Sequence, residues 1–175
     1  MNSTARWKFI RNEDSIVKGQ VKMKLVIASD HAGFALKEQI REFLQEQKFS
    51  VKDYGTYSDE AANWAEYGAK AASAVSADPE NTVGILICGS GIGMSIVANK
   101  FKHVRAALCR DENDARTARS HNNANVLALG ARVTDSATAL RIVDVFLETT
   151  FEGGRHQARL DFLSRDVEDT LQLKH

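Results

Sequence analysis

The chain has 175 residues, and its 23 Lys and Arg side chains balance 23 Asp and Glu, so its formal net charge is zero. A chain of this length can form one domain whose core buries roughly two thirds of the unfolded surface. The balanced charge gives no overall field that would attract nucleic acid or an anionic membrane, and no stretch approaches the roughly 18 apolar residues of a membrane span. We therefore expect neither partner, and any anion site must be local.

Two cysteines, Cys88 and Cys109, fall in segments that are expected to be buried strands. This usage is more typical of a reducing compartment than of a disulfide framework, which predicts a cytoplasmic protein. Residues 1–22 lack the apolar core of a signal peptide, so we interpret them as an N-terminal extension and residues 23–175 as a single domain. Met23 directly precedes the first clear strand, which leaves the true start open.

The hydrophobic pattern predicts strands that alternate with amphipathic helices. Strands are expected at residues 24–29, 50–54, 83–87, 105–110 and 125–129. Helices are expected around residues 36–44, after the glycines at 89–93, and over 61–77, 111–120, 136–149 and 155–171, with a loop at 121–123. Such alternation requires right-handed crossovers and predicts an open parallel sheet with helices on both faces.

The most informative stretch joins the strand at 83–87 to Cys88 and to three glycines, Gly89, Gly91 and Gly93. Glycines allow a tight turn and close approach to a ligand, and the N–H groups of the following helix start favour an anion or a developing oxyanion. A base just before this loop would face the same ligand. The alternative is that Cys88 is only a small buried hydrophobic residue beside a turn.

Two better-known glycine loops fit this stretch less well. A P-loop requires Gly-Lys-Ser/Thr, whereas Met94 follows the last glycine here. A dinucleotide fingerprint that starts at Gly89 would need Gly or Ala at position 94, but Asp111 ends the next strand at about the right distance. Dinucleotide binding therefore stays open as the second interpretation.

Other polar residues follow the predicted strands. Asp30 and His31 follow the first strand and Cys88 and Ser90 the third, so a parallel sheet brings them to one edge, although an Asp-His pair is also typical of a simple turn. His121 precedes a strand and would ordinarily lie at the opposite edge. The combination of imidazole, carboxylate, thiol and glycine loop favours an active site.

Arg155 and Arg159 are spaced i, i+4 after a glycine pair, which suits a phosphate but also an ordinary solvated basic face. His156 faces elsewhere on a helical wheel and is left out of this group. No His, Cys, Asp or Glu residues show the usual ligand spacing, so we expect no metal site.

These motifs together closely resemble the type B ribose-5-phosphate isomerases and their galactose-6-phosphate and allose-6-phosphate isomerase relatives. Order and spacing agree from about residue 23 to residue 161. The matching segments are 29–33 (SDHAG) with 36–37 (LK), 87–93 (ICGSGIG), 98–100 (ANK), 120–123 (SHNN), 129–132 (LGAR) and 152–159 (EGGRHQAR).

The resemblance implies a three-layer αβα sandwich with a five-stranded parallel Rossmann-like sheet. It also implies a phosphorylated sugar as substrate, a place in the pentose phosphate pathway, and neither a metal nor an organic cofactor. The family forms homodimers whose site lies near the subunit boundary, so a partner's His121 could complete the pocket; a tetramer is left open.

Site roles follow from the resemblance by position. Cys88 is placed as the base that moves a proton between C1 and C2, and His121 as the residue that opens the sugar ring with the help of Asp30. The anion hole is assigned to Gly89, Gly91, Ile92 and Gly93, with the Ser90 hydroxyl at its lip. A sugar contact is assigned to Asn122. Phosphate or substrate contacts are assigned to His31, Arg132, Arg155 and Arg159.

Two positions depart from the family pattern. One branch uses a glutamate where this chain has Met94, which leaves Cys88 as the candidate base. The usual Asp-Tyr-Pro is replaced by Asn-Trp-Ala, with Trp64 at its centre, which bears on the substrate more than on the reaction. Ribose 5-phosphate is the expected substrate. The alternatives are galactose 6-phosphate, allose 6-phosphate, a tetrose phosphate, or a non-catalytic sugar-phosphate or dinucleotide-binding module.

Overall fold

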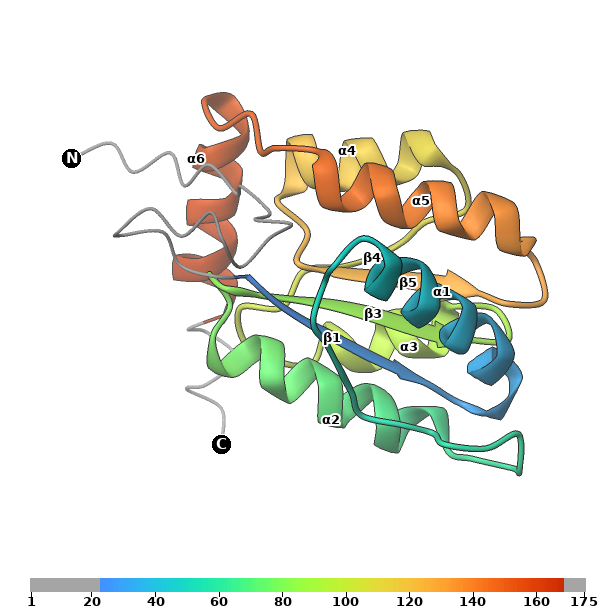
Figure 1. The fold of residues 1–175 in the computed structure, drawn as a ribbon. Coiled ribbons are helices and arrows are strands. Elements are labelled where there is room, and N and C mark those ends of the chain that lie inside the picture. Colours follow the sequence, from blue (N-terminus) through green and yellow to red (C-terminus); the bar gives the residue numbers. More distant parts are fainter. Residues whose placement is uncertain (1–22, 169–175) are drawn as a thin grey trace.

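The computed structural model describes residues 23–168, apart from the side chains at 165, 166 and 168. The N-terminal extension expected over residues 1–22 lies outside the described residues, as does the end of the last predicted helix. Within the described part, five strands form one parallel sheet in the order β2-β1-β3-β5-β4 (Figure 1). The strands are β1 (Lys24–Ser29), β2 (Val51–Asp53), β3 (Thr82–Cys88), β4 (Ala106–Leu108) and β5 (Val126–Gly130).

Helices cover both faces of this sheet, with α1, α4 and α5 on one side and α2 and α3 on the other (Figure 1). Their bounds are α1 (Phe34–Glu46), α2 (Trp64–Ala77), α3 (Ile92–Ala98), α4 (Glu112–Asn122), α5 (Ser136–Glu148) and α6 (Arg155–Phe162). A 3₁₀ turn, η2 (His31–Gly33), precedes α1, and a π-helical segment, η3 (Leu163–Glu168), continues α6. The expected αβα sandwich with a five-stranded parallel sheet is confirmed.

The three inner strands, β1, β3 and β5, are largely apolar because both of their faces are buried, whereas the edge strand β2 is Val-Lys-Asp. Successive side chains of a strand point to opposite faces, so Leu25 and Ile27 join the core under α1 and α5, while Val26 and Ala28 join the core under α2 and α3. Cys88, the last residue of β3, belongs to the second core. Each helix from α1 to α5 contributes apolar residues to one of the two cores, as its amphipathic sequence predicts.

Two local predictions are wrong. The segment 121–123 is not a loop, because α4 continues to Asn122 and ends at Asn123, whose φ of +45° is the left-handed conformation that asparagine tolerates. The strand expected at 105–110 shrinks to Ala106–Leu108, because the N–H of Arg110 donates to Asp114 Oδ2 (3.0 Å) at the start of α4.

Among the described helices, none combines the length and the apolar character that crossing a membrane requires.

Candidate active site

The glycine loop begins where β3 ends. Gly91 adopts a φ of +77°, and a Cβ added there would lie 2.9 Å from the carbonyl carbon of Leu129, so only glycine fits this turn. The turn directs the Gly91 N–H at Cys88 Sγ, with an N···S distance of 3.1 Å. A hydrogen bond donated to sulfur stabilises a thiolate over a thiol. The loop therefore holds the Cys88 sulfur against its own backbone donors.

Ser90 and Gly93 complete the loop. Ser90 Oγ accepts a hydrogen bond from the Ile92 N–H (3.3 Å), which fixes the hydroxyl at the start of α3. The Trp64 indole packs on Gly93, where an added Cβ would lie 2.8 Å from the ring. The first turn of α3 and the first residue of α2 thus form one surface beside Cys88.

The end of β1 lies against the end of β3. The Asp30 N–H donates to the Ile87 carbonyl (3.1 Å), and Asp30 Oδ1 accepts from the Gly33 N–H (2.9 Å), so the buried carboxylate caps η2. His31 Nδ1 accepts a hydrogen bond from the Ala62 N–H (3.2 Å). Asp30 and His31 therefore reach the same edge of the sheet as Cys88, as the parallel topology predicts.

Arg132 also lies at this edge. Its N–H donates to the Gly89 carbonyl (2.9 Å), and its side chain runs 3.3–3.4 Å from where a Gly89 Cβ would be. A guanidinium group thus borders the glycine loop, where it can bind an anionic substrate group.

A buried lysine that sequence reasoning left without a role supports this region. Lys37 is fully buried, and its ammonium group donates to Asp53 Oδ2 and to the Thr56 carbonyl, each at 2.6 Å. The sequence signal that could have revealed this role is a lysine on the apolar face of a helix, because a charged group is tolerated in a buried position only when it is paired.

The remaining predicted residues lie elsewhere. Because α4 runs back from the carboxyl end of β4, its last residues, His121 and Asn122, reach the amino-terminal edge of the sheet. Arg155 and Arg159 lie on α6 at the same end of the molecule, where β1 begins (Figure 1). The Glu152 N–H donates to the Ser120 carbonyl (3.0 Å) and ties the α5–α6 connection to α4.

His156, which was left out of the predicted phosphate group, is buried, whereas Arg155 and Arg159 are exposed. His156 is 4% exposed and stacks on His121, with ring centroids 4.3 Å apart and planes within 7°. Burial lowers the pKa of His156, and the positive charges of His121 and Arg155 lower it further, which favours a neutral ring. A helical wheel could not show this contact, because the stacking partner comes from another helix.

Three possible metal ligands meet here, although sequence spacing predicted none. Glu152 Oε2 lies 3.8 Å from His121 Nε2 and 3.7 Å from His156 Nε2. However, parallel stacked rings direct their nitrogen lone pairs along parallel lines, and Arg155 Nε donates to His156 Nε2 (3.4 Å). The cluster is therefore not arranged around a common metal position.

A buried arginine holds the end of α4 in place. Arg119 Nη1 donates to the Ala124 carbonyl (2.5 Å) and to Asn123 Oδ1 (3.2 Å), and its guanidinium packs over the Phe146 ring. Burial lowers the pKa of Arg119 to about 10, with a smaller effect from Arg105, so the group stays charged at neutral pH. Arg119 thereby fixes the turn that carries His121.

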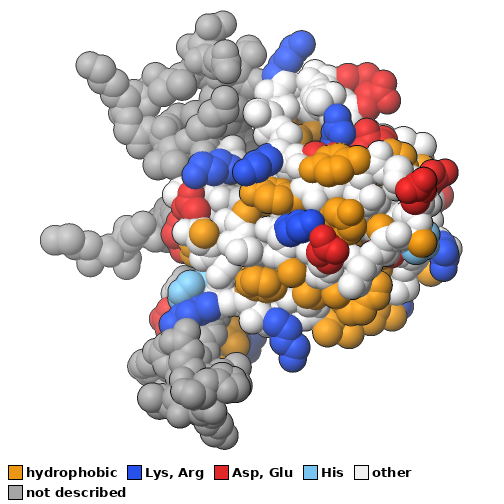
Figure 2. Space-filling view, turned by 90° about the horizontal axis from the view of Figure 1, so that it is seen from below, with side chains coloured by type: hydrophobic (Ala, Val, Ile, Leu, Met, Phe, Trp, Pro, Cys, Tyr) orange, Lys and Arg blue, Asp and Glu red, His pale blue; other side chains and the backbone are white. Residues whose placement is uncertain are grey.

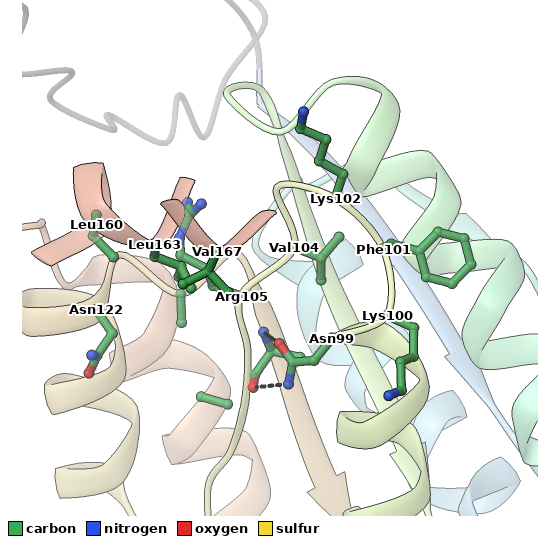
Figure 3. Close-up of a pocket in the computed structure, with 13 residues that line it drawn as sticks. Asn99, Lys100, Phe101, Lys102, Val104, Arg105, Asn122, Leu160, Leu163 and Val167 are labelled. Carbon is green, nitrogen blue, oxygen red and sulfur yellow. Dashed lines mark hydrogen bonds between the residues drawn. The ribbon is translucent and has the colours of Figure 1, made fainter. Parts of the chain in front are cut away.

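Cys88 and His121 consequently lie at opposite edges of the sheet in one chain. The strand between these edges, β3, has seven residues and is about 20 Å long. A cavity of about 680 Å³ lies at the amino-terminal edge and includes Asn122 in its lining (Figure 3). Across it, Leu160, Leu163 and Val167 face the segment that carries Val104 (Figure 3). Cys88 does not line this cavity.

Comparison with known proteins places this geometry in a family. The model of the family described as Ribose/Galactose Isomerase matches residues 25–163. A putative sugar phosphate isomerase of Rickettsia bellii is 46% identical over 136 residues, which are 78% of this chain and 94% of the relative. Ribose-5-phosphate isomerase B of Escherichia coli is 44% identical over 141 residues, which are 81% of this chain and 94% of the relative.

Solved structures agree with the sequence matches. Ribose-5-phosphate isomerase B of Clostridium thermocellum superposes with a TM-score of 0.82 at 43% identity, covering 85% of this chain and 99% of the other. The enzyme of Mycoplasma genitalium, solved with bound ribulose 5-phosphate, gives a TM-score of 0.81 at 42% identity, covering 84% of this chain and 97% of the other. The chain therefore belongs to the ribose/galactose isomerase family.

Proposed function

We propose that the protein is an aldose–ketose isomerase that interconverts ribose 5-phosphate and ribulose 5-phosphate in the cytoplasm. The observation that carries this proposal is the hydrogen bond from the Gly91 N–H to Cys88 Sγ (3.1 Å). It brings the Cys88 sulfur to a loop of backbone donors, which supports a role for this thiol as the base. The chain that carries it is similar along most of its length to an enzyme solved with ribulose 5-phosphate.

The reaction begins with an open sugar chain. His121 opens the ring by transferring a proton to the ring oxygen, and Asp30 assists at the hydroxyl that becomes the carbonyl. An imidazole suits this step because it ordinarily titrates near neutral pH. The aldehyde then lies beside the glycine loop.

Cys88 performs the proton transfer. Its thiolate removes the proton from C2, the electron pair of that C–H bond forms the C1–C2 double bond, and the C1 oxygen takes the negative charge of the enediolate. The same sulfur returns the proton to C1 while the proton of the C2 hydroxyl passes to the C1 oxygen, which leaves the ketone at C2. The Gly91 N–H serves the sulfur and the Ile92 N–H serves Ser90 Oγ, so the N–H groups of Gly89 and Gly93, with the Ser90 hydroxyl, stabilise the oxyanion. Each such donor typically contributes about 3 kcal/mol to the transition state.

The phosphate and the sugar hydroxyls fix the orientation of the substrate. His31 and Arg132 bind from the glycine-loop edge, and Asn122, Arg155 and Arg159 bind from the α4–α6 edge. Guanidinium groups suit this task because they hold phosphate oxygens through paired hydrogen bonds.

Because Cys88 and His121 lie at opposite edges of one chain, we propose a homodimer in which each site takes Cys88 from one subunit and His121 from the other. Ile92 and Ile96 on α3 are 47% and 52% exposed, although both are large and apolar. Hydrophobic side chains gather on the face formed by α2 and α3 (Figure 2). Phe162 on α6 is 58% exposed, so both sets of site residues adjoin apolar surface that a partner can cover.

The proposal is tested by NMR of ribose 5-phosphate and purified protein in heavy water. We expect ribulose 5-phosphate to appear with deuterium at C1, and deuterium to enter C2 of ribose 5-phosphate through the reverse reaction. We expect Cys88→Ala to abolish both the product and the label. Cys109→Ala is the matched control, because Cys109 is 1% exposed and burial, with smaller effects from Asp114 and Asp111, raises its pKa to about 12.

Full activity in Cys88→Ala would refute the role of this thiol. If the wild type forms no product, the same measurement with allose 6-phosphate, galactose 6-phosphate and erythrose 4-phosphate decides whether another phosphosugar is the substrate. Inactivity on all of them would favour a non-catalytic binding module.

A further inference from the structure

We infer that the segment of residues 54–63, the β2–α2 loop, positions His31 by donating the Ala62 N–H to its Nδ1 atom, and that Lys37 holds this loop in place. The contact selects the tautomer of the neutral His31 ring in which the N–H is on Nε2. This inference deepens the proposed function, on which its kinetic consequence rests. It makes Ala62 and Lys37 positioning residues, neither of which reaches the substrate in this scheme.

The first step is the contact between Ala62 and His31. The Ala62 nitrogen lies 3.2 Å from His31 Nδ1, and its N–H points at the ring nitrogen. A backbone amide is a permanent donor, so Nδ1 must be the acceptor and the proton of a neutral ring must be on Nε2. The rival arrangement, in which Nδ1 carries a proton and donates to the Ala62 carbonyl, has the longer distance of 3.4 Å.

The second step is the attachment of the loop to β1. The Thr56 N–H donates to the Ser29 carbonyl (2.8 Å), and the Ser29 N–H donates to the Gly55 carbonyl (2.6 Å). At its other end, Asn63 caps α2 by accepting a hydrogen bond from the Ala65 N–H (3.0 Å). Ala62 therefore directly precedes Asn63, which is fixed by this cap, and the loop brings Ala62 back to the end of β1, beside His31.

The third step is the anchoring role of Lys37. Its ammonium group has three protons and three oxygen partners: Asp53 Oδ2 and the Thr56 carbonyl at 2.6 Å, and Glu38 Oε1 at 3.2 Å. The side chain is fully buried, so this arrangement must persist for the charge to remain there. Lys37 thus joins α1, the end of β2 and the loop at one point.

The consequence concerns how His31 binds an anion. A ring whose Nδ1 is held by Ala62 offers Nε2–H as a hydrogen-bond donor in one orientation before the substrate arrives. Orientation fixed in advance reduces the entropy lost on binding. Losing the hold on Nδ1 should therefore weaken substrate binding more than it slows proton transfer at Cys88.

The direct test is NMR of the ¹⁵N-labelled full-length protein. We expect a nitrogen–nitrogen coupling across the hydrogen bond between the Ala62 amide and His31 Nδ1, and an Nε2–H signal from the neutral ring. We expect Lys37→Met to remove the coupling. A proton on Nδ1 of the neutral wild-type ring, or a coupling that is unchanged in Lys37→Met, would overturn the inference. This readout needs no substrate, so it stands apart from the proposed function.

The kinetic test uses Ala62→Pro, which deletes the donating N–H without touching a side-chain contact of Lys37. We expect KM for ribose 5-phosphate to rise by about fivefold to tenfold, as for the loss of one hydrogen bond, with kcat changed less than twofold. Ala61→Pro is the matched control for stiffening the loop and should leave both constants unchanged. An unaltered KM in Ala62→Pro, or equal losses in both variants, would overturn the positioning role.

Discussion

At the scale of single residues, the site depends on a backbone conformation that glycine alone adopts easily. Gly91 and Gly153 both have positive φ, +77° and +68°, but their surroundings differ. A Cβ at Gly91 would meet the Leu129 backbone, whereas a Cβ at Gly153 would meet nothing within 4 Å. Substitutions at these two glycines therefore distinguish the cost of backbone strain alone, at Gly153, from the cost of strain together with a steric clash, at Gly91.

We expect Gly153→Ala to lower the free energy of unfolding by about 1–2 kcal/mol, the cost of a left-handed backbone in a residue with a Cβ. Gly91→Ala should cost more, because its methyl group also displaces β5, and should lower kcat because the N–H leaves Cys88 Sγ. Urea denaturation followed by circular dichroism measures both variants. Equal losses of stability in the two would show that the Leu129 contact relaxes without penalty.

Residue-level prediction from sequence succeeded where chemistry was local. The strand, thiol and glycine loop around Cys88 were readable because a tight turn leaves its glycines in the sequence. The stacking of His156 on His121 was not predicted, because the two residues lie on different helices and a contact between helices has no sequence period. Lys37 was visible as a charge on an apolar stripe, but its partners come from β2 and the following loop.

At the scale of elements, helix α5 begins with a charged cap whose contribution depends on pH. Asp135 Oδ1 accepts a hydrogen bond from the Thr138 N–H (2.9 Å), and Asp135 Oδ2 accepts from the Thr138 hydroxyl (2.7 Å). These bonds, the backbone bond first, lower the pKa of Asp135 below its usual 3.8. The folded state therefore favours the charged carboxylate. Its stabilising effect is fully present above the usual pKa of 3.8 and is lost as the pH falls through the lowered pKa of the folded state.

We expect Asp135→Asn, which keeps a capping side chain without the charge, to melt below the wild type at pH 6 and to approach it as the pH falls below 3.8. Melting temperatures by calorimetry across this range measure the difference. Asp59→Asn, in the β2–α2 loop, controls for the change of net charge. A difference between wild type and Asp135→Asn that does not shrink in acid would contradict a charged cap.

Element boundaries were predicted less well than element types. The end of α4 was placed too early because Asn122 and Asn123 both suggest a loop, and only the left-handed Asn123 ends the helix. Both edge strands were predicted too long, because strand pairing extends only where the neighbouring strand supplies partners. The two inner strands next to each other, β1 and β3, matched their predicted ranges almost completely.

At the scale of the whole molecule, the proposed dimer makes each site a product of two chains. We expect Cys88→Ala and His121→Asn to be inactive separately and to recover about a quarter of wild-type activity when equal amounts are unfolded and refolded together. Half of the randomly formed dimers are then mixed, and one of the two sites in each has both native residues. Activity is measured by the conversion of ribose 5-phosphate.

The control pairs Cys88→Ala with Ser90→Ala, because both residues come from the same subunit in each site. No site in a mixed dimer of these two variants has both native residues, so activity cannot exceed that of the less impaired variant. The absence of recovery for Cys88→Ala with His121→Asn, in a preparation shown by mass spectrometry to contain mixed dimers, would contradict a shared site.

The fold could be predicted from the sequence because the alternation of buried strands and amphipathic helices allows few topologies. The placement of His121 at the opposite edge was also expected, because it precedes a strand, and the course of α4 agrees with this expectation.

The shortness of the outer strands affects how the protein meets other chains. Both outer strands of the sheet, β2 and β4, have only three residues. An exposed strand edge is a template on which a foreign strand can add and on which amyloid-like growth can start, and a three-residue template offers too few backbone hydrogen bonds to hold one. Copies of this chain are therefore expected to associate through helix surfaces, and the folded protein is expected to resist aggregation by sheet extension.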